Sequence, residues 1–401
     1  MALLALLSYA CKERNPQMGI LLGTLEGDAS EAIGINDAGM VIGHWWEKDG
    51  RQRAFLWTQQ TGAQDIGTLG GSYCEAVGIN NNAGMITGRT GTTNHGNRAF
   101  LWTKEMGMQD IGTLGSNYSY ATAINDAGMI VGNSDTRDNE EHAFWWTRED
   151  GMQSFDIPDT ERIRPKAINK AGVVTGTLLT KQGKMHSFIW TREGGGQVIG
   201  TLGGDYSWIS DINDAGKIVG DSMIPNGNEN AFIWDQENGM RTLTFGGDSN
   251  ATAINNAGMV VGYADTKGPA IHAFLWTQED GMQDLGTLGG TFSDAVAINN
   301  AGKVVGRSLT KNGKSRAFVW TQEGGMQNLG ALGYDHSRAV AINESGQIVG
   351  YVWNDPPFWI RTLYWAHQEI GLPSKYLPKI RGVSEYSEAA LWTVPVAKKS
   401  E

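Results

Sequence analysis

The sequence is poor in cysteine, with only Cys11 and Cys74. Two thiols form at most one disulfide and cannot supply a thiolate metal cluster, so neither a disulfide-stapled scaffold nor a structural zinc site is expected. No apolar run reaches the ~18 residues of a membrane-spanning helix. No segment repeats its apolar residues with a sustained period of 3.6, which predicts that helix is nearly absent.

Basic residues are also in deficit. The chain has 32 Lys and Arg against 43 Asp and Glu, a net charge of −11 that is spread without long runs. Such a balance repels nucleic acid and anionic membranes, so neither is expected as a partner. No Pro/Ser-rich or charged linker divides the 401 residues, which favours one domain.

The first residues, "MALLALLSYAC", are apolar but lack the positive charge that opens a secretory signal. A lipoprotein signal ending at Cys11 is disfavoured because Ser8 stands where leucine is expected. Residues 1–17 are therefore interpreted either as a degenerate export signal or as an N-terminal tail.

One phrase, of the type "AINDAGMIVGN", recurs along the chain. Its first Asn stands at Asn36, Asn80, Asn125, Asn169, Asn213, Asn255, Asn299 and Asn343, a step of 42 to 45 residues. Each repeat contains four apolar runs of strand length, here called a, b, c and d, separated by Gly, Asn and Asp. Around Asn299 these runs are "AVAIN", "KVVGRS", "RAFVWT" and "MQNLGAL". The pattern predicts an antiparallel four-stranded meander in each repeat.

Runs a and c are apolar at successive positions, so both faces of these strands must be buried. Radially packed sheets bury both faces, and a four-stranded repeat of this length is typical of a β-propeller blade. We therefore predict an all-β propeller with eight blades, with seven or nine as the alternatives. Small residues of run a suit the crowded axis, and the large rings of run c suit the wider space between blades. Those rings are Trp57, Trp102, Trp146, Trp190, Trp234, Trp276, Trp320 and Trp365.

The string "HAFLWT…GMQDLGTLGG…AINNAGKVVG" at 272–306 resembles the bacterial HAF repeat, named for the tripeptide found here at His272 to Phe274. The resemblance covers roughly residues 18–366 and implies an extracytoplasmic, cell-surface repeat protein without a known general activity. The blade plan also resembles that of WD repeats, with Trp-Thr in place of Trp-Asp.

The chain ends predict how the ring closes. Residues 18–28 read as a d strand without a preceding a, b and c, whereas the last repeat ends at a c strand near Trp365. The first d strand is therefore expected to complete the last blade and to remove an exposed edge. The propeller is assigned to 18–366. The tail 367–401 contains a degenerate c strand, "EAALWTVP", which either takes part in closure or caps one face.

The recurring phrase itself is interpreted as the a–b turn. Its Asn side chain bonds to the backbone, and its Gly takes the positive φ that ends a type I turn with a bulge. Cation binding by the Asn and Asp oxygens is the alternative. It is disfavoured because one turn carries Lys170 and none has the carboxylates of a calcium loop.

Two variable positions lie at the opposite end of the repeat, where the d–a and b–c loops meet. Five residues before each turn Asn stand Glu31, Glu75, Tyr120, Arg164, Trp208, Asn250, Asp294 and Arg338. Directly after the Gly of run b stand His44, Arg89, Asn133, Thr177, Asp221, Tyr263, Arg307 and Tyr351. Uniform positions build the frame, so these mixed positions are candidates for recognition. Drift at a solvated rim is the alternative.

Tryptophans outside the repeat pattern gather after run b of the first and last repeats. Together with His44 and Tyr351, an aromatic cluster is predicted from Trp45, Trp46, Trp353 and Trp359. Such a cluster stacks on sugar rings or holds peptide side chains. The alternative is that these rings seal the seam where the ring closes.

Catalytic motifs are absent from the sequence: there is no Gly-x-Ser-x-Gly elbow, no His-Glu-x-x-His and no phosphate-binding loop before a helix. His142, His186 and His272 share a repeat position with Arg53, Arg98 and Arg316, which indicates a loop anchor and no metal site. Paired acids near the axis, such as Glu31 and Glu75 on adjacent blades, are candidates for acid–base chemistry on a glycan.

The sequence thus predicts a non-catalytic scaffold that binds a protein, peptide or glycan through the d–a and b–c loop face, with no cofactor. A carbohydrate-active hydrolase or lyase that uses carboxylates, Arg or His at the channel mouth is the alternative. A purely structural role at the cell surface is a third possibility, and the oligomeric state is left open.

Overall fold

The computed structural model describes residues 19–94, 96–355 and 387–393. Every regular element in these ranges is a β-strand, so none of them forms a helix able to cross a membrane. The strands pair antiparallel within sets of four, and single parallel pairs join neighbouring sets at Asn97 with Tyr118 and at Ile271 with Phe292. The predicted all-β class and four-stranded meander are therefore confirmed.

The four-stranded sets are called units 1 to 8 in chain order of their first strands. Unit 1 comprises β2 (Ala29–Ile35), β3 (Val41–Trp46), β4 (Gln52–Thr58) and β5 (Gly62–Asp65); unit 2 comprises β6 (Gly70–Ile79), β7 (Ile86–Thr92), β8 (Asn97–Thr103) and β9 (Gly107–Asp110). Unit 3 comprises β10 (Gly115–Ile124), β11 (Ile130–Thr136), β12 (Glu141–Thr147) and β13 (Gly151–Phe155); unit 4 comprises β14 (Thr160–Ile168), β15 (Val174–Thr180), β16 (Met185–Thr191) and β17 (Gly195–Gly200). Unit 5 comprises β18 (Ser207–Ile212), β19 (Ile218–Met223), β20 (Glu229–Asp235) and β21 (Gly239–Leu243); unit 6 comprises β22 (Ser249–Ile254), β23 (Val260–Asp265), β24 (Ile271–Thr277) and β25 (Gly281–Asp284). Unit 7 comprises β26 (Gly289–Ile298), β27 (Val304–Thr310), β28 (Ser315–Thr321) and β29 (Gly325–Asn328); unit 8 comprises β30 (His336–Ile342), β31 (Gln347–Trp353), β32 (Ser387–Thr393) and β1 (Gly19–Leu21).

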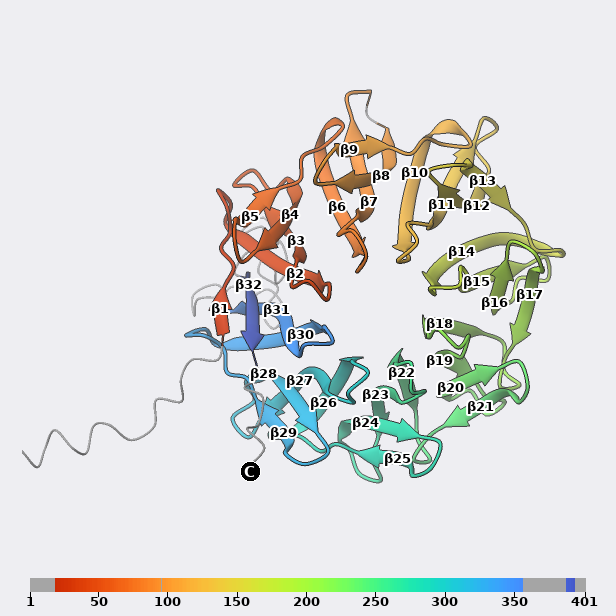
Figure 1. The fold of residues 1–401 in the computed structure, drawn as a ribbon. Helices are drawn as coiled ribbons and strands as arrows, with labels where there is room; N and C mark the ends of the chain where they lie inside the picture. The colour runs from red at the N-terminus through yellow and green to blue at the C-terminus, as the bar shows by residue number, and fades with distance from the viewer. Residues whose placement is uncertain (1–18, 95, 356–386, 394–401) are drawn as a thin grey trace, which may run out of the picture.

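The units stand radially around a central axis, with the first strand of each unit nearest the centre (Figure 1). A hydrophobic core lies between each pair of neighbours. Between units 6 and 7, for example, Val261 and Leu275 pack with Val304 and Phe318. This arrangement buries both faces of each sheet, which explains the continuous apolar runs.

Phenylalanine, two positions before the predicted tryptophan, is the more deeply buried ring between units. Phe55, Phe100 and Phe318 are at most 1% exposed. Of the tryptophans, Trp57, Trp190, Trp234 and Trp320 are buried, whereas Trp102, Trp146 and Trp276 are half-buried. The predicted role of large rings between units therefore falls first on the phenylalanines.

The a–b turn has the predicted chemistry. In unit 3 the Gly128 amide donates to the Asn125 carbonyl at 3.0 Å, and the Met129 amide donates to Asn125 Oδ1 at 2.9 Å. The turn glycines all have a positive φ between 61° and 86°, namely Gly39, Gly84, Gly128, Gly172, Gly216, Gly258, Gly302 and Gly346. The interpretation of the repeated phrase as this turn is confirmed.

Replacing Gly128 with Val tests the turn. A β-branched residue is strained at a φ of 82°, and its Cβ would stand 2.9 Å from Met85 Cε. We expect a loss of about 1–3 kcal/mol in the free energy of unfolding, measured by denaturant titration. The Gly128→Asn variant is the control, because Asn tolerates the left-handed region. Equal stability of the two variants would contradict this account.

The turn asparagines also link the units, a role the sequence reading missed. Asn36 Nδ2 donates to the backbone carbonyl of Asn80, and the same bond recurs from each unit to the next at 3.1–3.3 Å. The eighth bond runs from Asn343 Nδ2 to the carbonyl of Asn36, 307 positions away, at 3.1 Å. These side chains are 2–6% exposed. One residue type therefore forms the turn and connects it to its neighbour.

Unit 8 departs from the predicted strand order. The sequence placed its c strand near Trp365, in residues that the structure does not describe. The place next to β31 is taken by β32, and Trp392 pairs with Ile348 as Trp320 pairs with Val304. The Ala389 amide donates to Ser30 Oγ at 3.0 Å, the bond that Ala317 makes with Ser337 in unit 7. Residues beyond 366, assigned to a tail, thus contribute a full strand, and β1 pairs with its outer side.

Candidate functional site

The two variable positions come together as cross-strand pairs. In each unit the residue five before the turn Asn lies opposite the residue that follows the Gly of the second strand. The pairs are Glu31–His44, Glu75–Arg89, Tyr120–Asn133, Arg164–Thr177, Trp208–Asp221, Asn250–Tyr263, Asp294–Arg307 and Arg338–Tyr351. Because cross-strand neighbours point to the same face of a sheet, each unit presents one two-residue combination near the axis.

Some of these side chains tie neighbouring units together. His44 Nε2 lies 2.9 Å from the carbonyl of Ala76, and Asn133 Nδ2 donates to the carbonyl of Ile163 at 2.7 Å. Burial lowers the pKa of His44, which favours the neutral ring in this bond. His44 Nε2 and Asn133 Nδ2 therefore serve the frame, whereas Asn133 Oδ1 is buried without a hydrogen-bond partner.

Other pairs are internally neutralised. Arg89 Nε lies 2.6 Å from Glu75, and the Tyr73 hydroxyl donates to the same carboxylate at 2.5 Å. Burial opposes ionisation of Glu75, but the hydrogen bonds from Tyr73 and Arg89 outweigh it and lower the pKa. Asp294, 6% exposed, accepts from Arg307 at 3.1 Å and from Arg338 at 3.4 Å. These charges are satisfied within the protein.

The residues of the predicted aromatic cluster do not all lie on one face. Trp45 is 6% exposed and packs with Val349 and Leu391 of unit 8, so it fills the seam and offers no face to a ligand. Trp46 lies on the other face of the strand, beside His44 at 6.3 Å, because successive strand residues alternate. Trp353 lies 5.5 Å from Tyr351 and stacks on His336 at 5.0 Å. Trp359 lies outside the described residues.

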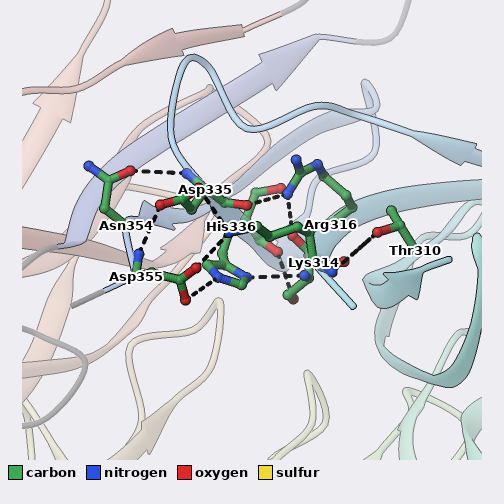
Figure 2. A network of polar contacts seen from close by, with 9 residues as sticks. Thr310, Lys314, Arg316, Asp335, His336, Asn354 and Asp355 are labelled. Atoms are coloured by element: carbon green, nitrogen blue, oxygen red, sulfur yellow. Dashed lines mark hydrogen bonds and ion pairs between the residues drawn. The ribbon is translucent and has the colours of Figure 1, made fainter. Parts of the chain in front are cut away.

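A polar network surrounds His336 (Figure 2). Lys314 Nζ donates to Asp335 at 2.9 Å and to Asp355 at 2.6 Å. His336 Nε2 lies 3.0 Å from Asp355, and the amide of Ser315 donates to His336 Nδ1 at 3.1 Å. Because Nδ1 accepts, Nε2 carries the proton and donates to Asp355.

This network resembles half of a catalytic triad, but both ring nitrogens of His336 are already occupied, which leaves none to act as a base. The hydrogen bond from Lys314, followed by that from His336, holds the pKa of Asp355 at about 2 despite partial burial. The network therefore anchors the loop after β27 to the start of unit 8.

Three cavities are relevant to binding. One of about 780 Å³ lies beside β1, β4 and Trp102, and no predicted site residue lines it. One of about 350 Å³ lies at the axis on the turn side and is lined by the turn asparagines with Asp126, Lys170 and Asp214. The third, of about 610 Å³, lies between units 4 and 5 and is lined by Trp208. Among the predicted site residues that the structure describes, Trp208 is the exposed large ring, at 41%.

A further column of residues was missed by the sequence reading. Seven positions before the turn Asn stand Ala29, Tyr73, Tyr118, Arg162, Tyr206, Asp248, Phe292 and His336. Five of these eight are aromatic or histidine, and they lie on the same face as the variable pairs. Comparing the residues seven positions before the turn Asn with those five positions before it would have identified these aromatic residues from the sequence.

No protein-family model and no curated protein sequence matches the chain. Solved structures do match. A puromycin-hydrolysing peptidase of Mycobacterium tuberculosis aligns with a TM-score of 0.53 at 10% identity, over 84% of this chain and 61% of that one. Dipeptidyl peptidase 4 of Porphyromonas gingivalis aligns with a TM-score of 0.51 at 11% identity, over 80% of this chain and 57% of that one.

The β-propeller domain of the trilobed protease of Pyrococcus furiosus aligns with a TM-score of 0.49 at 9% identity, over 76% of this chain and 99% of that domain. The chain covers about three fifths of the length of the two peptidases. At these identities the likenesses to the two peptidases show the fold alone. With its radial four-stranded antiparallel sheets, the chain is a β-propeller.

Proposed function

We propose that this propeller is a non-catalytic binding scaffold whose d–a and b–c loop face recognises a protein, peptide or glycan. The observation that carries the proposal is the contrast between the two ends of the inner strands. At the turn end, one hydrogen bond repeats from unit to unit. At the loop end, the eight cross-strand pairs differ in charge, size and aromatic character.

The scaffold is proposed to have eight blades, one for each unit, closed jointly by β1 and by the turn asparagines. Support comes from the pairing of β1 with β32 and from the bond between Asn343 and Asn36. The HAF-type resemblance and a cell-surface location are retained as part of this proposal.

The enzyme alternative has weaker support. Glu31 and Asp221 are the mouth acids whose pKa is raised, chiefly by burial, and a raised pKa suits a general acid. They lie in units 1 and 5, on opposite sides of the ring (Figure 1). Glu75, the predicted partner of Glu31, is held ionised by Arg89 and Tyr73. A two-carboxylate mechanism needs both groups at one glycosidic bond.

The test compares the loop end with the turn end of the inner strands. Arg164 at the loop end and Lys170 just beyond the turn end of β14 are both exposed cations. The purified protein is screened on glycan and peptide arrays, and each hit is measured with the Tyr120→Ala/Arg164→Ala and Lys170→Ala variants. We expect the loop-end variant to weaken binding about tenfold or more, because both side chains border the proposed face. The Lys170 variant should bind like the parent.

Ligand binding that survives the loop-end variant and is lost with Lys170→Ala would contradict the proposal. So would the absence of any array ligand bound specifically by the folded protein. Turnover of an array glycan, detected as release of a reducing end, would favour the enzyme alternative.

A further inference from the structure

Unit 5 differs from its neighbours in how its aromatic side chains are covered. In unit 2 the guanidinium of Arg89 lies 5.5 Å from the ring centre of Tyr73, and in unit 7 that of Arg307 lies 5.0 Å from Phe292. Each of these arginines also binds the carboxylate of its cross-strand partner. In each of these two units, therefore, one guanidinium lies against an aromatic ring and is paired with a carboxylate of the same unit.

The corresponding rings in other units are covered by different groups. Tyr118 has Tyr120 at 5.8 Å, and His336 has Trp353 at 5.0 Å. In unit 5 the equivalent residues are Tyr206 and Trp208, and among the described residues neither has an aromatic ring or guanidinium stacked on it. Trp208 is 41% exposed, so its ring is open to a ligand.

The residue that supplies the covering arginine in units 2 and 7 is Asp221 in unit 5. The aromatic rings are therefore accompanied by a carboxylate where the sister units have a cation. Asp221 is 8% exposed and accepts a hydrogen bond from Asn250 Nδ2 at 2.7 Å. Burial, followed by the charge of Glu229, raises the pKa of Asp221 to about 6, and the hydrogen bond from Asn250 opposes this shift.

The cavity beside Trp208 has a volume of about 610 Å³ and is lined by Tyr206, Met185 and the charged residues Lys184, Asp205 and Glu229. Lys184 Nζ lies 3.2 Å from Asp205, so these two charges offset each other. Glu229 accepts a hydrogen bond from the neutral Tyr206 hydroxyl and has no salt bridge within the described chain. The site holds aromatic faces and uncompensated negative charge.

We propose that the Trp208 cavity binds the cationic group of a basic side chain, guanidinium or ammonium, presented by a peptide or protein partner. This inference rests on the proposed function and names the ligand class for one part of the same face. A cation over the exposed ring of Trp208 is attracted by the ring quadrupole. The carboxylate of Glu229, which lines the same cavity, strengthens the contact. The partner supplies the component that Arg89 and Arg307 supply within their own units.

The experiment follows the indole N–H signal of Trp208 in the full chain by ¹H–¹⁵N NMR, the signal being identified by its loss in Trp208→Ala. The probes are acetyl-Gly-Arg-Gly-amide, its Lys analogue and its citrulline analogue, in which the side chain is neutral but nearly isosteric with arginine. We expect saturable shifts with the Arg and Lys peptides and affinity about tenfold or more weaker for citrulline. Affinity should fall as salt is raised, because the charges are exposed.

Three variants separate the ligand site from the fold. Glu229→Gln removes charge with little change of shape, and we expect about 3- to 10-fold weaker binding of the Arg peptide. Asp221→Arg places a guanidinium where units 2 and 7 have one, and we expect it to abolish binding while the melting temperature is kept. Lys170→Ala, on the turn side, should leave the titration unchanged.

Each remaining outcome overturns the inference. Equal affinity for the citrulline and Arg peptides would show that the cavity does not require a positively charged side chain. A shift of the Trp208 signal with neutral oligosaccharides and none with the peptides makes this a glycan site. If no probe moves the signal while an array ligand binds elsewhere on the loop face, the inference fails and the proposed scaffold function stands.

Discussion

Replacing Trp392 with alanine is expected to lower the free energy of unfolding by about 3–5 kcal/mol, the range for buried Trp→Ala changes. Trp392 is fully buried and packs among Val319, Leu329 and Ile348 in the core between units 7 and 8. It lies in β32, the third strand of the last unit. The loss would therefore weaken the strand that joins β1 to the rest of unit 8.

The measurement is denaturant unfolding followed by circular dichroism, with Trp208→Ala as the matched control. Trp208 is 41% exposed, so its removal should cost less than about 1 kcal/mol. If the two variants unfold alike, residues 387–393 do not form the third strand of unit 8, and the sequence-based assignment of that strand near Trp365 regains its place.

Loss of one turn asparagine is the second large effect. In Asn213→Ala the amide of Lys217 loses its acceptor at 2.9 Å, and the carbonyl of Asn255 loses the donor from the neighbouring unit at 3.1 Å but keeps the Gly258 amide at 3.0 Å. One group is then left without a partner, which costs about 1–3 kcal/mol, so we expect a loss of about that size.

The matched variant is Asn343→Ala, at the seam between units 8 and 1. It breaks the equivalent bond to Asn36, which joins the last unit to the first. If the ring is closed as proposed, the two variants should be destabilised to a similar degree in denaturant titrations. A cost for Asn343→Ala that is several-fold smaller would show that the seam opens without it, and the proposed closure would then be wrong.

Several features were predictable because they depend on local chemistry. The positive φ of Gly128 follows from the Asn-x-x-Gly spelling of a single turn. The continuous apolar runs indicated sheets buried on both faces, and their repeat indicated radial packing. The columns of variable residues were found at the loop end because a strand keeps its register over a few residues, and the structure pairs them across β18 and β19, for example.

Other features depended on which segments meet. Trp45 and Trp46 are adjacent in sequence and equally aromatic, yet one is buried in the seam and the other lies beside His44. Alternation along a strand predicts that the two rings lie on opposite faces of the sheet. Which of the two faces is buried depends on how unit 1 packs against unit 8. The uncovered state of Trp208 likewise became visible only when its cross-strand partner and the stacked arginines of other units were known.

The repeat, the turn and the four-stranded plan follow from the amino-acid sequence alone, because each is specified by residues within one period of 42 to 45 positions. The tertiary structure decided which segment supplies the last third strand, since "EAALWT" and the run near Trp365 both have the required apolar pattern. It also decided the partner of each turn asparagine, which lies in the next unit. These arrangements depend on the free energy of packing and hydrogen bonding between units, so they cannot be derived from one repeat taken alone.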